Sequence, residues 1–531
     1  MTEIALYDST LRDGSQAEGI SFSVDDKLKI AQQLDNLGVS YIEAGNPGSN
    51  VKDQEFFSRA QGLKLRHASL VAFGSTRRRD MKCSDDENFN RLASCPVKTV
   101  AIFGKSWRFQ VSDILKTSGE ENLRMIGESV KYLCDKGFTV FFDAEHFFDG
   151  YLADREYALR TLSVAMENGA SALVLCETRG GLLPFQVGEI TASVVSSFTL
   201  PIAIHAHDDS GCAVANSLMA VQAGARQVQG TLLGFGERCG NACLATVVAD
   251  LSFKMDCSCL NGENLENLTS VSRAVAEISN VAISHNAPYI GGSAFAHKGG
   301  MHIDGVTKNP KSFEHVPPLA VGNERRLLMS EVAGRALMLK RIGRIVPDLD
   351  KDDPSTIALM QKLKALEAEG YQFEGAESSF DLVIRRQLLS YKPFFTLVHY
   401  QTIGSLPYAD PAGEVTHAAV VKVKVGQKSA ITAAEGEGPV NALDKALRKV
   451  LEPFYPSLRN VHLTDYKVRV LSGDEATASK VRVLIESTDG LKNWSTIGVS
   501  KDIIEASWLA LADSIEYCLI ADGVKSREGV V

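Results

Sequence analysis

The 531-residue sequence has no hydrophobic run near the roughly 18 apolar residues that a membrane-spanning helix needs. It also has no extended basic stripe, since the arginine clusters at 77–79 and 325–326 are too short to form one and the net charge is −9. The first residues, MTEIALYDSTLRDG, show no basic leader followed by an apolar stretch. We therefore expect a protein that binds neither membranes nor nucleic acid and is not secreted.

The ten cysteines form no CxxC pair, so the sequence has no zinc-ribbon pattern. They are scattered through apolar and helical stretches, which is typical of reduced thiols in a chain of this length. This usage predicts a cytoplasmic protein.

Short β-rich apolar runs alternate with helical patterns through the first 250 residues or so. Helix patterns such as 24–38 and 122–137 end in glycine, which favours a left-handed helix terminus. Strands that alternate with helices pair in parallel, and eight such units in about 250 residues are typical of a (β/α)8 TIM barrel. The alternative, a doubly wound open sheet, lacks the Gly-rich fingerprint after the first strand. The expected strands lie at 4–10, 39–45, 69–75, 99–104, 139–145, 172–178, 202–207 and 228–236.

The pattern changes after about residue 260. Residues 265–345 look helical with a Gly-rich interruption, and a Pro/Asp cluster leads into an exposed helix that ends at Gly370. Beyond 390, strands at 394–401, 418–425, 466–471 and 480–487 are interspersed with helices at 438–454 and 500–519, like a weak internal repeat. We therefore expect an α/β chain with a TIM-barrel domain at 1–265, helical subdomains at 266–385 and an α+β domain at 390–531.

Polar side chains at the expected strand ends point to a metal site. His205 and His207 are two apart in a strand, so both imidazoles face the same side at the end of the seventh strand. Asp13 follows the first strand, which in a closed barrel is separated from the seventh only by the eighth. Asp13, His205 and His207 can thus hold a divalent metal ion, with Zn²⁺, Mn²⁺, Co²⁺ and Mg²⁺ all open. The alternative is that His205 and His207 bind no metal and only form hydrogen bonds at the barrel mouth.

Other strand-end groups can serve substrate. Arg12 offers a guanidinium fork for a carboxylate or a developing oxyanion, although it could simply pair with Asp13 on the surface. Asn241 can add an oxygen ligand or cap a helix. Glu43, Glu145 and Thr178 also face the expected site, and any one of them could be structural.

Five motifs together resemble one enzyme family, the metal-dependent Claisen-condensing synthases that make 2-isopropylmalate, homocitrate and citramalate. These motifs are DSTLRDGSQ (8–16), IEAGNP (42–47), HAHDDSGCAVANS (205–217), GFGERCGN (234–241) and HKGGMHIDG (297–305). The segments 435–448 and 498–517 resemble the family's C-terminal regulatory domain. Residues 143–150 and 302–316 are most similar to the citramalate-forming members, which implies acetyl-CoA and pyruvate as substrates and a role in isoleucine biosynthesis.

The resemblance implies a role for each motif residue. Asp13, His205 and His207 would bind the metal with Asn241 as a further ligand, and Arg12 would stabilise the alkoxide. Thr178 would bind the keto-acid carboxylate, and Glu43 lies in the substrate site. His302 with Asp304 is the expected base for acetyl-CoA, with Glu145 as its rival. His302 and Asp304 lie outside the barrel, so the helical segments would have to cover the active site. The resemblance implies a homodimer in which this segment of each chain covers the site of its partner.

The resemblance also implies feedback regulation, with isoleucine as the expected inhibitor bound by the C-terminal domain. The keto acid of 2-isopropylmalate or homocitrate synthase is the nearest alternative, and a lyase running the reaction in reverse is another. A non-catalytic amino-acid-sensing scaffold is the alternative from a different class. Phe73 and Phe103 are expected to narrow the keto-acid pocket, and Phe313 stands where some relatives have a tyrosine.

Overall fold

The computed structural model describes residues 2–262, 264–328, 353–389, 391–405, 416–471, 479–490 and 492–524, with 342–343 and 345–346 between them. The chain divides into two compact units, each described here by itself. The first comprises Met1–His297 and Gly305–Arg326, and the second comprises Lys298–Asp304 and Leu327–Val531. Within the described residues, no helix combines the length and apolar character needed to cross a bilayer.

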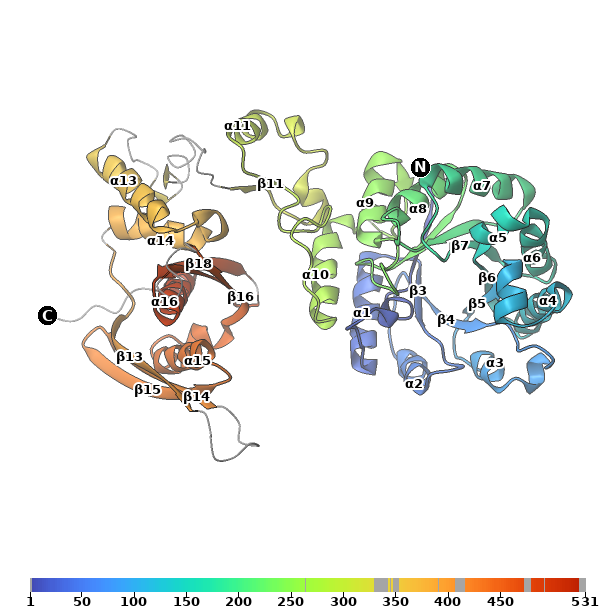
Figure 1. Ribbon diagram of the computed structural model, residues 1–531, viewed down its shortest axis with the longest axis horizontal. Coiled ribbons are helices and arrows are strands. Elements are labelled where there is room, and N and C mark those ends of the chain that lie inside the picture. Colours follow the sequence, from blue (N-terminus) through green and yellow to red (C-terminus); the bar gives the residue numbers. More distant parts are fainter. Residues whose placement is uncertain are drawn as a thin grey trace. The chain divides into compact units, whose positions relative to one another are not determined.

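Eight parallel strands close into a barrel, which confirms the expected fold class. Helices surround these strands (Figure 1). The strands are β2 (Ala5–Asp8), β3 (Tyr41–Gly45), β4 (Ser69–Ser75), β5 (Thr99–Lys105), β6 (Thr139–Glu145), β7 (Ala172–Glu177), β8 (Ile202–Ala206) and β9 (Gln227–Gly230). Strand β9 pairs with both β8 and β2, so the first and seventh barrel strands are separated by one strand, as the sequence predicts.

The barrel helices form where the apolar spacing and capping residues indicate. Ser23 caps α1 through a reciprocal pair of hydrogen bonds with Asp26, and Gly38 ends this helix with a φ of 96°. A two-stranded pair, β1 (Thr2–Glu3) with β10 (Cys257–Ser258), lies outside the barrel sheet. The helices are α1 (Val24–Leu37), α2 (Val51–Ala60), α3 (Glu87–Leu92), α4 (Gly119–Asp135), α5 (Phe147–Ala153), α6 (Arg155–Glu167), α7 (Pro184–Ser197), α8 (Ala213–Gln222) and α9 (Leu244–Lys254).

A largely helical region follows the barrel. It contains α10 (Leu268–Ile278), α11 (Gly300–Lys308), α13 (Pro354–Glu369), α14 (Glu377–Leu388) and the short pair β11 (Ala296–His297) with β12 (Arg326–Leu327). Gly370 ends α13 with a φ of 113°, as the sequence predicts.

The C-terminal region repeats one arrangement of three antiparallel strands followed by a helix. The first copy has β13 (Thr396–Ser405), β14 (Thr416–Val425), β15 (Lys428–Gly436) and α15 (Pro439–Leu451). The second has β16 (His462–Val470), β17 (Val481–Thr488), β18 (Asn493–Ser500) and α16 (Ile503–Ala521). Both copies contribute to one apolar core, including Val421, Leu443, Ile485 and Leu511. The repeat and the α+β class are thus as expected, with β15 and β18 as additional strands.

Candidate metal centre and active site

The barrel interior changes character from one end to the other. Tyr7, Val71, Ala101, Phe141 and Ala172 come from five strands and form one buried apolar cluster. Side chains two residues further along a strand face the same interior, and there the buried groups become polar, including Glu43, Asp143 and His205. Carboxylate and imidazole groups of the interior therefore gather toward the C-terminal end of the strands, where barrel enzymes place their active sites.

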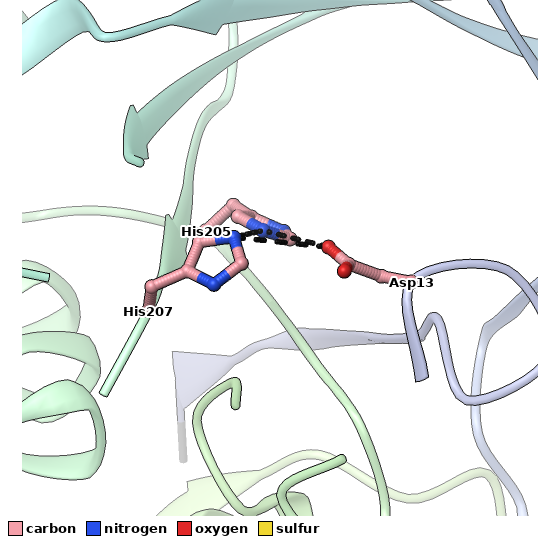
Figure 2. A group of neighbouring side chains, drawn as sticks. All are labelled: Asp13, His205 and His207. Atoms are coloured by element: carbon pink, nitrogen blue, oxygen red, sulfur yellow. Dashed lines mark hydrogen bonds and ion pairs between the residues drawn. The ribbon is translucent and has the colours of Figure 1, made fainter. Parts of the chain in front are cut away.

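Asp13, His205 and His207 converge at this end of the barrel. Figure 2 shows the two imidazoles, from β8 and the residue after it, pointing toward the Asp13 carboxylate on the loop after β2. Asp13 Oδ2 lies 3.4 Å from His205 Nε2 and 3.8 Å from His207 Nε2, and the two Nε2 atoms are 3.4 Å apart. Ligands held at about 2.0–2.2 Å from one ion lie about 3.0–3.6 Å from each other. Two of the three separations lie within this range and the third is slightly longer, so the three groups are placed to hold a single cation.

The protonation states of Asp13 and His207 also suit a metal, whereas burial of His205 is outweighed by the hydrogen bond and charge of Asp13, which raise the pKa of His205 while no cation is bound. Burial opposes ionisation of Asp13, but the Arg12 charge and the hydrogen bond to His205 hold the pKa of this carboxyl well below its usual range. Burial and the neighbouring His205 lower the pKa of His207 to about 4, so this imidazole is neutral near pH 7. A carboxylate and a neutral imidazole are the forms that bind a metal.

Asn241 lies beside this cluster, because its backbone forms an isolated bridge with His207. Its Nδ2 donates to the carbonyl of Phe235 at 3.0 Å, whereas its Oδ1 is buried without a hydrogen-bond partner among the described residues. A buried, unsatisfied carbonyl oxygen is costly unless something else binds it. Together with the two imidazoles and the carboxylate, this oxygen makes the donor set fit a divalent cation.

Arg12 is held in place by Glu43. Its Nε donates to Glu43 Oε2 at 2.5 Å, its Nη1 lies 3.3 Å from Asp13 Oδ2, and its Cζ is 3.8 Å from the centre of the Phe73 ring. Glu43 is fully buried and also accepts hydrogen bonds from the hydroxyls of Tyr7 and Ser9. With its carboxylate occupied by three donors, Glu43 orients Arg12 next to Asp13, and its expected role in substrate binding stays a prediction.

Glu145 and Thr178 lie at neighbouring strand ends and are both engaged by other residues. Glu145 forms an ion pair with Lys105, its neighbour on β5. Thr178 directly follows β7, and its Oγ accepts a hydrogen bond from the backbone N–H of His146 at 2.9 Å. Both positions agree with the strand-end placement that the sequence predicts.

His302 and Asp304 lie on α11, and the structure places both in the second unit. The barrel cluster belongs to the first unit. Their predicted role as the base thus stays a prediction.

Asp143 is a buried carboxyl near the candidate site that the sequence reasoning did not identify. It lies on β6 two residues before Glu145 and therefore faces the same interior. Burial, together with the negative charge of Glu43, raises the pKa of Asp143 to about 7. The alternation in FFDAE at 141–145 would have indicated it, because residues 141, 143 and 145 of a strand face the same side.

Comparisons with known proteins cover nearly the whole chain. Residues 3–275 match the HMGL-like family, residues 289–370 match the homocitrate synthase post-HMGL domain-like family, and residues 374–519 match the LeuA allosteric (dimerisation) domain. Among solved structures, an HMG-CoA lyase from Bacillus subtilis aligns with 55% of this chain and 97% of its own, at 21% identity and a TM-score of 0.47.

Relatives of the same length share much higher identity. The (R)-citramalate synthase of Geobacter sulfurreducens is 48% identical over 98% of both chains, and that of Aquifex aeolicus is 48% identical over 100% of this chain and 99% of its own. The probable 2-isopropylmalate synthase of Methanopyrus kandleri is 31% identical over 95% of this chain and 96% of its own. The chain therefore belongs to the HMGL-like family, among the synthases that combine this barrel with a LeuA allosteric (dimerisation) domain.

Proposed function

We propose that this chain is an (R)-citramalate synthase that condenses acetyl-CoA with pyruvate and water to give (R)-citramalate and CoA. The observation that carries this proposal is the buried cluster of Asp13, His205 and His207 beside Arg12. It occurs in a chain that is 48% identical to (R)-citramalate synthases over its full length.

Asp13, His205, His207 and Asn241 would hold a divalent metal ion. When bound, such an ion supplies a Lewis acid that polarises the keto-acid carbonyl. Arg12 lies beside Asp13 and donates to the carbonyl oxygen as negative charge develops on it. The Thr178 hydroxyl, at the adjacent strand end, binds the keto-acid carboxylate.

The condensation needs a base that removes a methyl proton from acetyl-CoA. The resulting carbanion attacks the pyruvate carbonyl carbon, the alkoxide takes up a proton, and water then cleaves the thioester to release CoA. Glu145 forms an ion pair with Lys105, and a carboxylate that is paired with an ammonium group is better suited to orient a substrate than to remove a proton from carbon. We therefore assign the base to His302, oriented by Asp304.

The stacked rings of Phe73 and Phe103 support a small keto acid. Their centroids are 5.4 Å apart with planes inclined by 17°, and Phe73 also lies against Arg12. A rigid aromatic wall next to the reacting groups leaves room for the methyl group of pyruvate more readily than for the isopropyl group of 2-ketoisovalerate.

The C-terminal region would dimerise the chain and sense an end product, with isoleucine as the expected inhibitor. Its match to the LeuA allosteric (dimerisation) domain supports both roles. Helix α15 starts after Gly438 without a side-chain cap, so the backbone N–H groups of its first turn are the proposed site for an amino-acid carboxylate.

The test is a thiol-release assay on metal-loaded protein with acetyl-CoA and a panel of 2-keto acids, with and without isoleucine. We expect the highest kcat/KM with pyruvate. A preference for 2-ketoisovalerate would instead identify a 2-isopropylmalate synthase. The Asp13→Asn and His207→Ala variants should remain folded and lose at least about 10²-fold in turnover. Unchanged cellular function in these variants would favour a non-catalytic sensing scaffold.

A further inference from the structure

Arg238 connects three loops that surround the metal centre. It lies in the loop after β9, where its Nε and Nη2 donate to the two carboxylate oxygens of Asp209 at 2.8 and 3.0 Å. Asp209 belongs to the loop after β8. The same Nη2 donates to the backbone carbonyl of Thr178, after β7, at 2.7 Å. A single guanidinium thus joins the ends of three consecutive strands.

Each of these loops presents one part of the candidate site. Thr178 lies on the first, His207 begins the second, and Asn241 lies on the third. Backbone hydrogen bonds run between the same loops, from His207 N to the Glu177 carbonyl at 3.1 Å and from Asp208 N to the Gly240 carbonyl at 2.9 Å. The guanidinium therefore adds a side-chain connection between the three loops that carry the proposed substrate and metal groups.

The local backbone is shaped for this contact. Arg238 has a φ of 59°, a left-handed conformation that residues with a Cβ adopt only in a few per cent of cases. On the opposite side, Gly180 has a φ of 66°, and a Cβ there would lie 2.4 Å from Asp209 Oδ2. The missing side chain at 180 leaves the space that the Asp209 carboxylate occupies. Strained residues of this kind cluster at functional sites, where surrounding contacts hold them.

We propose that Arg238 is a positioning residue that fixes Thr178 relative to the metal centre, without touching the substrate itself. This inference rests on the proposed function, because Thr178 is taken to bind the keto-acid carboxylate. A planar guanidinium can serve the Asp209 carboxylate and the Thr178 carbonyl together, whereas a lysine ammonium keeps the charge but loses the fork. The Arg238 side chain is 42% exposed, so its ion pair contributes little to folding.

The test compares Arg238→Lys with a matched control, Arg59→Lys. Arg59 is 44% exposed and pairs with Asp25, so it joins two barrel helices rather than strand-end loops. We expect Arg238→Lys to weaken pyruvate binding about tenfold. The measurements are the dissociation constant from ligand-induced thermal shifts without acetyl-CoA, and the KM. The kcat at saturating pyruvate should fall by less than about threefold, and Arg59→Lys should match the wild type.

A second variant, Asp209→Asn, tests the same connection if Arg238→Lys does not fold. It removes the charge but leaves the bond from Arg238 to Thr178, so a smaller loss of pyruvate binding is expected. Equal pyruvate affinity in the wild type, the control and the two loop variants would overturn the inference. If the wild type binds a different keto acid, the proposed function fails, and the same comparison with that acid still decides the role of Arg238.

Discussion

The buried carboxyl of Asp8 gives the barrel a pH-dependent stability. Its side chain is fully buried and accepts a hydrogen bond from the backbone N–H of Thr10 at 2.8 Å. Burial, with a contribution from the Glu43 charge, raises the pKa of Asp8 to about 7 from its model-peptide value of 3.8. Between these two values the folded chain holds a proton that the unfolded chain has lost, so stability falls as pH rises.

We predict that Asp8→Asn stabilises the protein more at pH 8 than at pH 5. The amide keeps the acceptor for Thr10 and has no proton to lose, so the variant escapes a penalty of about 2–4 kcal/mol that the wild type reaches above pH 7. The measurement is the difference in melting temperature between the variant and the wild type at the two pH values. An identical difference at both would show that the Asp8 carboxyl titrates normally.

Phe103 provides a second prediction at the scale of single residues. It stacks on Phe73, whereas the Arg12 guanidinium is held by Glu43, so removal of the Phe103 ring should widen the keto-acid pocket and leave the guanidinium in place. We expect Phe103→Ala to raise kcat/KM for 2-ketobutyrate relative to pyruvate by about tenfold, since one methylene group is worth about 1–3 kcal/mol in an apolar pocket. An unchanged ratio would place the keto-acid side chain elsewhere.

At the scale of secondary-structure elements, both ends of the segment that contains α11 are fixed by hydrogen bonds to the buried Glu314. Glu314 accepts hydrogen bonds from Arg325 Nε and Nη2, each at 2.6 Å, and its Oε1 lies 3.2 Å from His297 Nε2. His297 precedes α11 and Glu314 follows it. Burial does not prevent ionisation here, because the Arg325 hydrogen bonds lower the pKa of Glu314.

We predict that Glu314→Gln loosens α11 and leaves the barrel strands unchanged. Loss of the charge weakens the bonds to Arg325, at a cost of about 1–3 kcal/mol. Hydrogen–deuterium exchange should quicken in peptides that span α11 and stay constant in β5 and β6. Glu324→Gln alters an exposed neighbour and serves as the control. If the α11 peptides exchange at the same rate in Glu314→Gln as in Glu324→Gln, the proposed role of Glu314 is contradicted.

The barrel was predictable because its strands and helices each follow a strong local period. The convergence of Asp13, His205 and His207 followed from topology, since strand ends of a closed barrel meet at one rim. Strands β15 and β18 escaped prediction because their residues, KSAITAAEG and NWSTIGVS, are small or polar, and their form depends on pairing with β14 and β17. The contacts of Arg238 could not be predicted from the sequence either, because they depend on a left-handed backbone conformation at residues 238 and 180.

For the whole molecule, the outer face of the first C-terminal sheet has an apolar character that suits dimerisation. Ile403 and Ile431 are 45% and 59% exposed, and their partners on β14, Ala418 and Lys422, alternate with the buried residues of that strand. Exposed apolar side chains within a sheet are typical of surfaces that bind another chain.

We predict that Ile431→Glu shifts the protein from dimer toward monomer, because the new carboxylate would be desolvated in an interface. Sedimentation velocity over a range of concentrations measures the change. Lys428→Glu, at the start of the same strand, introduces a carboxylate near the sheet edge and is the matched control. A variant that dimerises like the wild type would exclude this face from the interface.

The division of the barrel interior into an apolar floor and a polar rim has an evolutionary consequence. Val71, Ala101, Phe141 and Ala172 support the fold from below while the reacting groups lie above them. Related enzymes are thus free to exchange rim residues and acquire new substrates while inheriting the same foundation, and thermal adaptation can proceed in the floor without retuning the reaction.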